Sequence, residues 1–412
     1  MNKTWKILIP ILFALALLLG FIERKNLAEF SLGSTQSHAQ FSRAVSDDDL
    51  EGYYQKAQSL RGTANTTNSA TFLAAGDVML SRKVATSIQK SGNVNLPFSN
   101  MESILKSTDF NFANLETPVA EKKGTIGGDS LIFNSPQENV KKLADNNFQI
   151  VNLANNHAFD QGLAGLDFTQ TFLNNLGIKH AGTGDSLEQA WQPAVVEANG
   201  IKICFVGASY ASVNDSGKTE NDYVARIEDL NNLQSAIRNS QSLCDFVVVT
   251  MHAGTEYTRN PNDAQTAFAH AAIDDGADMV IGAHPHWVQT IENYKGKYIF
   301  YSLGNFIFDQ NFSQETREGL TLKITISKQT CSQPIHGLTE DSTADKPVPH
   351  PDAGSANYAC ADSLQGSRIQ AQLDSIELTP VIIENFSTPR PATAAETKKI
   401  LEKIGETSTI LK

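Results

Sequence analysis

The stretch IVNLANNHAFDQG, residues Ile150 to Gly162, joins a short apolar run to a dense group of polar side chains. The apolar half resembles a buried strand, and the polar half carries Asn155, Asn156, His157 and Asp160. In open α/β sheets, ligands bind beyond the carboxyl ends of the strands. The stretch therefore predicts a buried strand that ends at a candidate functional site.

Apolar runs of this kind recur from about Thr71 onward, and turn or helix signals bound each of them. Helical spacing separates several runs, and Ser135 is the expected cap of the first helix, with Pro136 at its first position. Asn199-Gly200 predicts a hairpin turn. Together these signals predict a mixed α/β layered domain. The strand segments are TFLAAGD, FNFANLE, FQIVNLANNH, IKICFVGAS, DFVVVTMHAG, DMVIGAHPH and YIFYSLGNF, and the helical segments are 135–147, 164–177 and 263–278.

Beyond residue 320 the chain alternates between strands again, at 319–327 and 375–383, and a final helix is expected from about Ala392 to Ile404. A segment rich in Pro, Ser, Asp and Gly, at about 329–366, separates these two strands. We expect one folded domain over about 70–406 with this segment as a loop insertion.

The first 22 residues have the pattern of an export signal. Lys3 and Lys6 precede the uncharged apolar run Ile7–Ile22, which is slightly shorter than the ~20 residues that span a bilayer. Cleavage and retention both fit, but the nearest small-x-small pattern, at 37–39, lies far beyond the run and favours a retained membrane anchor. Residues 23–69 are polar and aperiodic, as in a tether. The domain is therefore expected outside the cytoplasm, and secreted if the signal is cleaved.

Charge and cysteine content narrow the partners and the compartment. With 33 Lys and Arg against 45 Asp and Glu the net charge is -12, and no basic stripe is present, so we expect no nucleic-acid partner. Export permits disulfides, and a bridge between Cys331 and Cys360 would stabilise the domain by about 3 kcal/mol. Cys204 and Cys244 lie in or beside apolar runs, where we expect small buried residues rather than a pair.

Most of the expected core strands end in a residue that can bind a metal or a phosphate-like group. Each has a structural explanation alone, but the carboxyl ends of neighbouring strands can meet at one site. Carboxylates, an amide and imidazoles without thiolates suit one or two divalent ions of Mn, Fe, Zn or Mg. The residues are Asp77, Glu116, Asn156, His157, His252, His284 and His286.

Six motifs carry a family resemblance. They are, in chain order, GDVMLSR, NLETPV, LANNHAFDQG, HAGTEY, GAHPHWVQ and YSLGNFIFD. Over about 70–327 and 368–406 the chain resembles the CapA/PgsA family of poly-γ-glutamate capsule biosynthesis proteins, which is related to the calcineurin-like metallophosphoesterases. The resemblance implies a metallo-dependent phosphatase-like α/β sandwich of two mixed β-sheets flanked by helices.

The resemblance also implies residue roles. Two departures matter: Met79 replaces a usual His ligand, and Glu116 replaces a usual Asp, so the first metal has fewer protein ligands. His157 would be the general acid or would stabilise charge developing on the substrate. Asp77 and His286 would bind the first metal, Glu116 would bridge, and Asn156, His252 and His284 would bind the second.

Further polar side chains near these motifs are candidates for contact with substrate. Arg82 could clamp a carboxylate or phosphate through its planar fork, with a salt bridge as the structural alternative. Glu256 and Tyr257 could orient a ligand histidine or touch substrate, although helix-start and packing roles also explain them.

Six other residues are candidates for supporting the site. Asp160 and Gly162 would shape the turn after His157 and cap the following helix. Trp287 either walls the pocket or packs as an ordinary aromatic. Residues that could fix imidazole orientation are Gln289, Asn305 and Asp309.

The leading hypothesis is a membrane-tethered extracytoplasmic protein that makes or exports an anionic envelope polymer such as poly-γ-glutamate. Metal-dependent hydrolysis or transfer is its expected chemistry, with membrane synthase subunits as possible partners. One alternative is a non-catalytic subunit that binds polymer or synthase, which Met79 favours. A general metal-dependent phosphodiesterase is the other. The group of Asn156, His157, His252 and His284 favours an enzyme.

Overall fold

The computed structural model describes residues 66–122, 124, 126–211, 222–330, 371–406 and 408–411. They fall in one of two units of the chain, Asn65–Lys412. The expected leader, nearly all of the expected tether, and the loop with Cys331 and Cys360 lie outside the described residues. Within the described part of the chain, no helix has both the length and the apolar character needed to cross a membrane.

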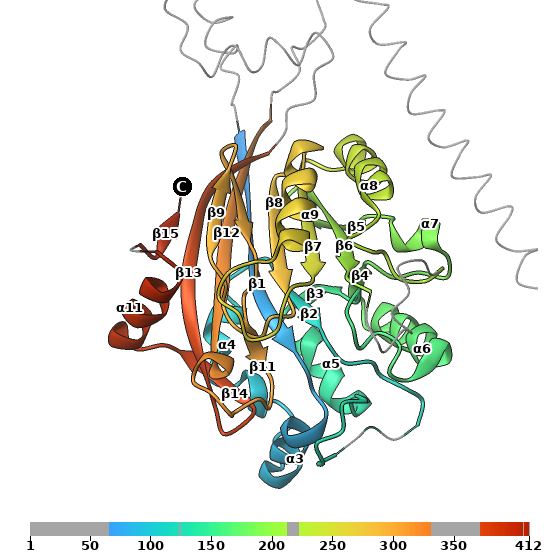
Figure 1. The fold of residues 1–412 in the computed structure, drawn as a ribbon, viewed down its shortest axis with the longest axis vertical. Helices are drawn as coiled ribbons and strands as arrows, with labels where there is room; N and C mark the ends of the chain where they lie inside the picture. Colours follow the sequence, from blue (N-terminus) through green and yellow to red (C-terminus); the bar gives the residue numbers. More distant parts are fainter. Residues whose placement is uncertain are drawn as a thin grey trace, which may run out of the picture. The chain divides into compact units, whose positions relative to one another are not determined.

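Two mixed β-sheets stack in the middle of the unit (Figure 1). The first sheet has the order β14-β13-β12-β1-β2-β3-β4, with β11 beside β1 and β15 beside β13. Strands β1 to β4 run parallel, whereas β12 and β13 are antiparallel. The strands are β1 (Thr66–Val78), β2 (Phe110–Leu115), β3 (Phe148–Asn152), β4 (Lys179–Ala181), β11 (Asn305–Ile307), β12 (Glu318–Thr330), β13 (Gln372–Glu384), β14 (Thr388–Pro391) and β15 (Ile410–Leu411).

The second sheet has the order β5-β6-β7-β8-β10-β9. Its four central strands are parallel, and β5 and β9 pair antiparallel at the two edges. Its strands are β5 (Ala194–Ala198), β6 (Ile201–Ser209), β7 (Phe246–His252), β8 (Met279–Ala283), β9 (Ile291–Tyr294) and β10 (Lys297–Phe300). The helices are α3 (Arg82–Ser91), α4 (Glu102–Leu105), α5 (Gln137–Asp145), α6 (Gly162–Asn175), α7 (Leu187–Ala190), α8 (Leu230–Leu243), α9 (Asp263–Asp274) and α11 (Ala394–Lys403), with 3₁₀ turns at Leu96–Phe98 and Glu315–Arg317.

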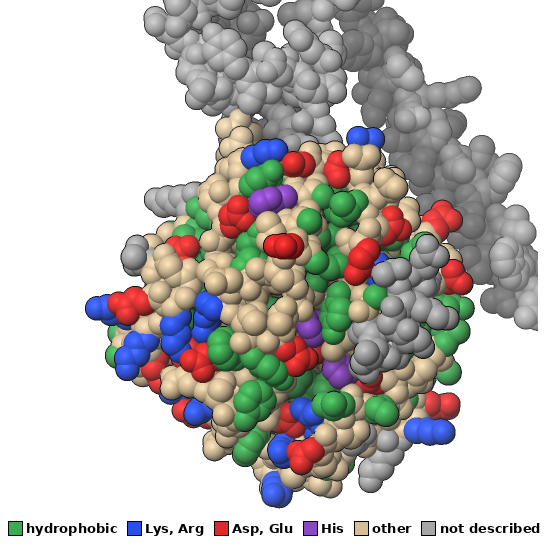
Figure 2. Space-filling model, viewed as in Figure 1, with side chains coloured by type: hydrophobic (Ala, Val, Ile, Leu, Met, Phe, Trp, Pro, Cys, Tyr) green, Lys and Arg blue, Asp and Glu red, His purple; other side chains and the backbone are tan. Residues whose placement is uncertain are grey.

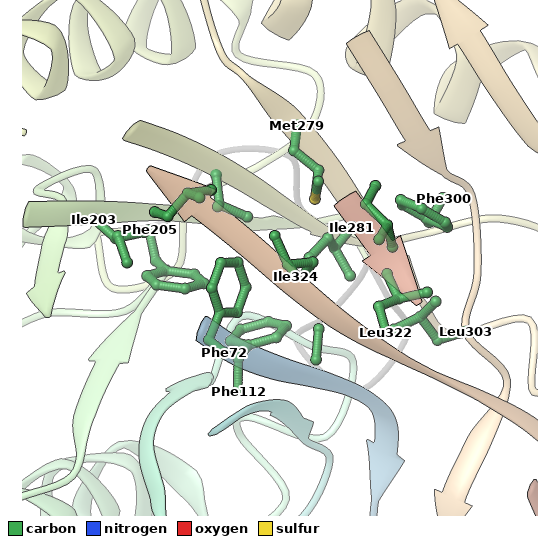
Figure 3. Close-up of a cluster of buried hydrophobic side chains, with 14 of the residues drawn as sticks. Phe72, Phe112, Ile203, Phe205, Met279, Ile281, Phe300, Leu303, Leu322 and Ile324 are labelled. Atoms are coloured by element: carbon green, nitrogen blue, oxygen red, sulfur yellow. The ribbon is translucent and has the colours of Figure 1, made fainter. Parts of the chain in front are cut away.

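The main core lies between the two sheets. Phe72 and Phe112 of the first sheet meet Phe205 of the second, and Phe112 stacks on Phe205 with ring centroids 5.2 Å apart (Figure 3). Separate buried clusters pack α3 and α5 on the outside of the first sheet, and α8 and α9 on the outside of the second. The result is the predicted sandwich of two mixed sheets flanked by helices, and this fold class is confirmed.

Two of the predicted local features are confirmed, and one predicted helix cap is wrong. The hairpin at Asn199-Gly200 is confirmed, with φ of 51° and 78° in the turn between β5 and β6. The final helix is also present and begins with Thr393 as its cap. Ser135 does not cap α5, because Pro136 occupies that position, and the Ser135 hydroxyl lies 2.9 Å from Thr117 Oγ1.

The cysteine expectation was wrong for Cys204 and Cys244, which form a disulfide. Cys204 lies on β6, and Cys244 follows the last residue of α8. The bridge therefore ties the outer helix to a central strand. Each thiol sits in an apolar setting, and sequence alone could not show that α8 packs on β6 at this point. The expected bridge between Cys331 and Cys360 lies outside the described residues.

The sheets bring the carboxyl ends of β1, β2, β3, β7 and β8 to one end of the sandwich (Figure 1). Gly76 permits this closure, because a Cβ there would lie 1.9 Å from the carbonyl oxygen of Gly304. Asp77 then pairs with Asn305 on β11, and the register shifts at Asp77 against both β2 and β11. Such irregularities redirect side chains, and here the redirected residue is a carboxylate.

Candidate metal centre

Asp77 is fully buried at the end of β1 and is held by hydrogen bonds. The Asn114 side chain donates to Oδ1 at 2.8 Å, and the His284 backbone N–H donates to Oδ2 at 3.3 Å. Asn152 in turn donates to the Asn114 carbonyl at 3.0 Å. A row of asparagines from β2 and β3 thus fixes the direction of the Asp77 carboxylate.

Glu116, directly after β2, is fully buried, and neither carboxylate oxygen has a hydrogen-bond partner. Burial, followed by the nearby Asp77 carboxylate, raises the pKa of Glu116 well above its usual value. An ionised carboxylate without donors is costly in a protein interior. A cation beside Glu116 would remove that cost, so the residue fits a metal ligand better than a structural role.

Two imidazoles and an amide converge on one side of Glu116. His252 Nε2 lies 3.6 Å from Glu116 Oε1, 2.8 Å from Asn156 Oδ1 and 3.1 Å from His284 Nδ1. Burial, and then repulsion from neighbouring histidines, lowers the pKa of His252 well below its usual value, and the pKa of His284 shifts the same way. Both rings are therefore neutral near pH 7, which is the form that binds metals.

His286 lies on the other side of Glu116. Its Nδ1 is 3.4 Å from Asp77 Oδ2, and its Nε2 is 3.9 Å from Glu116 Oε1. Asn305 Oδ1 lies 2.9 Å from His286 Nδ1. Asn305 therefore orients an imidazole of the site, as expected for one of the three residues named for this role.

These side chains form two groups with metal-ligand spacing, and Glu116 belongs to both. One group is Asp77, Glu116 and His286, and the other is Glu116, His252 and His284. Within each group the ligand atoms lie within 4.8 Å of one another. The donor set of carboxylates and neutral imidazoles suits divalent ions. The predicted ligands are therefore together, with Asn156 against the second group, although metal binding itself stays a prediction.

His157 also approaches the shared Glu116 carboxylate. Its Nε2 lies 3.7 Å from Glu116 Oε1, while its Nδ1 lies 2.8 Å from Asp160 Oδ2. Phe133 stacks on the imidazole with ring centroids 3.9 Å apart, and its backbone N–H donates to Asp160. One ring nitrogen is thus held by a buried carboxylate, and the other is directed into the site.

Arg82 is present at the edge of the site but is already engaged. Its guanidinium forms a buried ion pair with Asp309, donates to the Ser130 carbonyl at 3.2 Å and lies 4.7 Å from the Phe133 ring centroid. The salt-bridge alternative therefore describes its observed state, and contact with substrate stays a prediction. Through Phe133 the Arg82 side chain also supports the wall behind His157.

Glu256 and Tyr257 lie on the loop after β7. The Tyr257 ring is close to parallel with His286, with centroids 6.1 Å apart, and Gln310 donates to its hydroxyl at 3.3 Å. Glu256 is exposed, and its charge is one of those that raise the pKa of Glu116. Both residues thus border the cluster. Figure 2 shows histidine side chains at the surface in the lower half of the viewed face, with hydrophobic side chains on both sides.

Strained backbone conformations gather here. Positive φ values occur at Arg82 (48°), Tyr257 (60°), His284 (98°) and His286 (57°). Each such residue costs on the order of 1 to 3 kcal/mol and persists only where the surroundings hold it. Four such residues lie around one cluster, so holding these side chains in place lowers the stability of the folded protein.

Several expected supporting roles were wrong. Asp309 pairs with Arg82 rather than with an imidazole. Gln289 accepts from Gln265 at 2.9 Å and donates to the backbone of 258 and 260, also without a histidine. Asp160 does not cap α6, whose cap position is Gln161, and instead binds His157. For Trp287 the packing alternative describes the observed state, because the Arg259 guanidinium lies over its ring, 5.3 Å from the ring centroid.

Sequence reasoning missed Asn114 and Phe133, and it gave Asp160 another role than the one observed. Asn114 ends an apolar run within a quoted motif, so its position carried a signal that went unused. Asp160 follows His157 at a spacing of three, which allows a side-chain pair across one turn. Phe133 had no local signal, because only the tertiary fold places it on His157.

At position 79, the Met79 sulfur accepts from the Ser81 hydroxyl at 3.0 Å.

The fold and the centre together define an α/β sandwich protein with a cluster of candidate divalent-metal ligands at the carboxyl ends of its strands. Residues 71–310 match the model of a family described as bacterial capsule synthesis protein PGA_cap. The chain belongs to this family, as the motifs indicated.

Relatives of known name agree with this membership. The "PGA biosynthesis protein CapA" of Bacillus subtilis is 34% identical over 262 residues, which cover 63% of this chain and 68% of that protein. The "Capsule biosynthesis protein CapA" of Bacillus anthracis is 32% identical over 246 residues. That match covers 58% of this chain and 60% of the relative.

Solved structures give weaker likenesses. A calcineurin-like phosphoesterase from Bacillus subtilis has a TM-score of 0.44 at 11% identity, covering 82% of this chain and 97% of that one. A putative 5'-nucleotidase from Staphylococcus aureus also has a TM-score of 0.44, at 15% identity, covering 81% and 58% of the two chains. The fold class therefore rests on the sheet topology described above.

Proposed function

We propose that this protein acts in capsule synthesis as a metal-dependent hydrolase or transferase on an anionic envelope polymer of the poly-γ-glutamate type. The observation that carries the proposal is the buried Glu116 carboxylate. It has no hydrogen-bond donor, belongs to both ligand groups, and faces His157 Nε2 at 3.7 Å. A purely structural carboxylate would have been paired.

The relatives support the pathway more directly than the reaction. Two carry PGA biosynthesis or capsule biosynthesis in their names, and a Mycobacterium tuberculosis relative at 28% identity is called a probable polyglutamine synthesis accessory protein. We extend the role in capsule synthesis to this chain. The polymer, the bond attacked and any membrane synthase subunit as partner belong to the proposal.

Divalent ions in the two ligand groups, of Mn, Fe, Zn or Mg, would supply Lewis acidity to the scissile bond and the attacking water. His157 is placed to act as the general acid. As water adds to phosphorus or to a carbonyl carbon, it releases a proton to solvent, the P–O or C–N bond breaks, and Nε2 gives its proton to the leaving oxygen or nitrogen. His157 then regains a proton from solvent. Asp160 holds the proton at Nδ1 throughout, so the ring keeps its tautomer and orientation.

An extracytoplasmic location is part of the proposal. The charged start and the apolar run Ile7–Ile22 have the pattern of an export signal, with an uncleaved anchor as the favoured form. The disulfide between Cys204 and Cys244 supports the same location, because such bonds persist in oxidising compartments.

A non-catalytic subunit that binds polymer is the second candidate. Met79 favours it, because its sulfur accepts a hydrogen bond from Ser81 and adds no ligand to the first group. That group therefore has only three candidate ligands. Such a subunit would bind metal and polymer without breaking a bond.

Metal content and turnover of the purified full-length protein separate the two candidates. We expect bound Mn, Fe or Zn in the wild type, lost in His284→Ala and kept in His157→Ala. With bis-p-nitrophenyl phosphate and a γ-glutamyl oligomer as substrates, His157→Ala should lower kcat by about 100-fold or more.

Each outcome has a distinct meaning. Polymer binding without turnover, equal in wild type and His157→Ala, would overturn the enzymatic proposal in favour of the binding subunit. Absence of metal after supplementation with Mn and Zn would overturn both. Turnover of the phosphodiester alone would point to a general phosphodiesterase.

A further inference from the structure

A buried ion pair joins the first residue of α3 to the segment that follows β11. Its members are Arg82, which is 8% exposed, and Asp309, which is 6% exposed. Arg82 Nε donates to Asp309 Oδ2 at 3.2 Å, and Nη2 donates to Oδ1, so the fork holds both carboxylate oxygens. The backbone N–H of Lys83 also donates to Oδ2, at 3.1 Å. The carboxylate thus fixes the guanidinium plane against the start of α3.

Arg82 holds the chain segment that leads to α5 at three points. Its backbone carbonyl accepts from the Gly127 N–H at 3.0 Å, and its Nη1 donates to the Ser130 carbonyl at 3.2 Å. Its guanidinium lies over the Phe133 ring, 4.7 Å from the centroid. Because Phe133 is buried and stacks on the His157 imidazole, a shift of the guanidinium would be passed on to that imidazole.

The same guanidinium reaches a second histidine of the centre through Phe308. Its Cζ lies 5.8 Å from the Phe308 ring centroid, and that ring meets the His286 imidazole edge-on, with centroids 4.8 Å apart. Phe308 and Phe133 also contact each other edge to face at 6.1 Å. Arg82 therefore contacts two buried aromatic rings, one packed against His157 and the other against His286.

A buried ion pair is weak evidence of a role in stability, because an apolar pair of similar volume often stabilises a core as well. What the bidentate pair adds is a fixed orientation of a planar group. Nε and Nη2 of Arg82 are bonded to Asp309, and Nη1 is bonded to the Ser130 carbonyl. All three nitrogens are thus engaged inside the protein, and the contacts of the guanidinium lead to the centre.

We propose that Arg82 and Asp309 are positioning residues that set the separation of His157 from His286 across the centre. Through Phe133 and Phe308 the pair would hold the proton at His157 Nε2 at a fixed place relative to the first ligand group. This inference rests on the proposed function, in which His157 is the general acid. It assigns Arg82 no contact with substrate.

Two variants separate positioning from stability. Arg82→Met leaves the Asp309 charge unpaired in the interior, so it should also lower the unfolding temperature. Combining it with Asp309→Leu removes that charge and should restore the unfolding temperature. With bis-p-nitrophenyl phosphate, both variants should have a kcat about tenfold or more below the wild type and an unchanged KM, because a restored core does not restore the imidazole position. Arg238→Met, on the exposed face of α8, is the control and should change neither.

NMR of the full-length protein with isotope-labelled histidine gives a readout that needs no turnover. The imidazole signals of His157 are assigned by their loss in His157→Ala. In the wild type the Nδ1 proton should be protected from exchange by its bond to Asp160. In the double variant this proton should exchange faster and the ring signals should broaden or split, whereas the signals of His180 on β4 should stay as they are.

Each result bears on the inference separately from the proposed function. If kcat recovers together with the unfolding temperature in the double variant, the pair is only structural and the inference is overturned. A raised KM with unchanged kcat would assign Arg82 to substrate contact instead. If the wild type turns over neither the phosphodiester nor the γ-glutamyl oligomer, the proposed function fails. The His157 signals still decide in that case, and unchanged signals in the double variant would overturn the positioning role.

Discussion

Asp160 shows at the scale of one residue how the site is prepared. It is held between the Phe133 backbone N–H and His157 Nδ1. A carboxylate in that position fixes the imidazole and stabilises its protonated form, whereas an amide can present either an N–H or a carbonyl to the ring. The geometry therefore assigns Asp160 a positioning role with no contact to the reacting atoms.

Asp160→Asn should lower kcat on bis-p-nitrophenyl phosphate by about tenfold or more, with little change in KM, because the tautomer and orientation of His157 are no longer imposed. Metal content should stay at the wild-type value. Asp167→Asn, an acidic-to-amide change on the exposed face of α6, is the control. A loss of metal in Asp160→Asn would show that the carboxylate supports the ligands instead.

His180 gives a pH dependence of stability. Its folded-state pKa of about 4, lowered mainly by burial, lies below the usual 6.5. The unfolded chain therefore binds a proton first as the pH falls, and stability is lost between about pH 6.5 and 4, by up to about 3 kcal/mol.

His180→Gln should remove that part of the acid-side loss. Urea unfolding at pH 7 and pH 4.5 measures it, with His270→Gln on α9 as the control histidine variant. If wild type and His180→Gln lose the same free energy of unfolding between the two pH values, the assignment to His180 is wrong.

At the scale of elements, parallel strands position the residues of the centre, and a disulfide ties an outer helix to the second sheet. The ends of β1, β2, β7 and β8 supply Asp77, Glu116, His252 and His284. Irregular backbone at Asp77, rather than a regular strand end, directs the first of them. On the outer face of the second sheet, which α8 and α9 cover, the Cys204–Cys244 bond fixes α8 against β6.

Cys204→Ser combined with Cys244→Ser should lower the free energy of unfolding by about 2 to 4 kcal/mol. The bridge joins residues 40 positions apart and so restricts the unfolded chain, and without it the unfolded chain gains conformational entropy. Denaturant unfolding with and without reductant measures the change. Reductant should destabilise the wild type more than the double variant, which retains only the expected bridge between Cys331 and Cys360. Equal stability of the two oxidised proteins would contradict the expectation.

At the scale of the whole molecule, two sheets built from distant parts of the chain meet around Glu116, a buried carboxyl group without a hydrogen-bond partner. Glu116 is buried in the metal-free protein at a cost that a bound cation would offset. The ligands come from both sheets, so an ion held by them would also join the two halves of the sandwich.

Metal removal should therefore lower stability by about 3 kcal/mol, compared with protein at an ion concentration of about 100 times Kd. Glu116→Gln should lose metal affinity. In the absence of metal, however, this variant should be more stable than the wild type, because a neutral amide replaces a buried charge. Calorimetric scans of both proteins with Mn and with EDTA test this, and identical scans of the wild type in the two conditions would refute it.

The sequence alone determined the alternation of strands and helices, the family motifs and the residue types of the centre, because hydrophobic periodicity and local turn signals are written in neighbouring residues. It did so for Asp77, Glu116 and the histidines, which stand at the ends of apolar runs. Only the tertiary structure decided which side chains support them. Phe133 reaches His157, and Asp309 turns to Arg82, through contacts between segments far apart in the chain. The pairing of Cys204 with Cys244 and the burial of Gln170 Oε1 without a hydrogen-bond partner also depend on packing. Burial and the distance between side chains are properties of the folded chain.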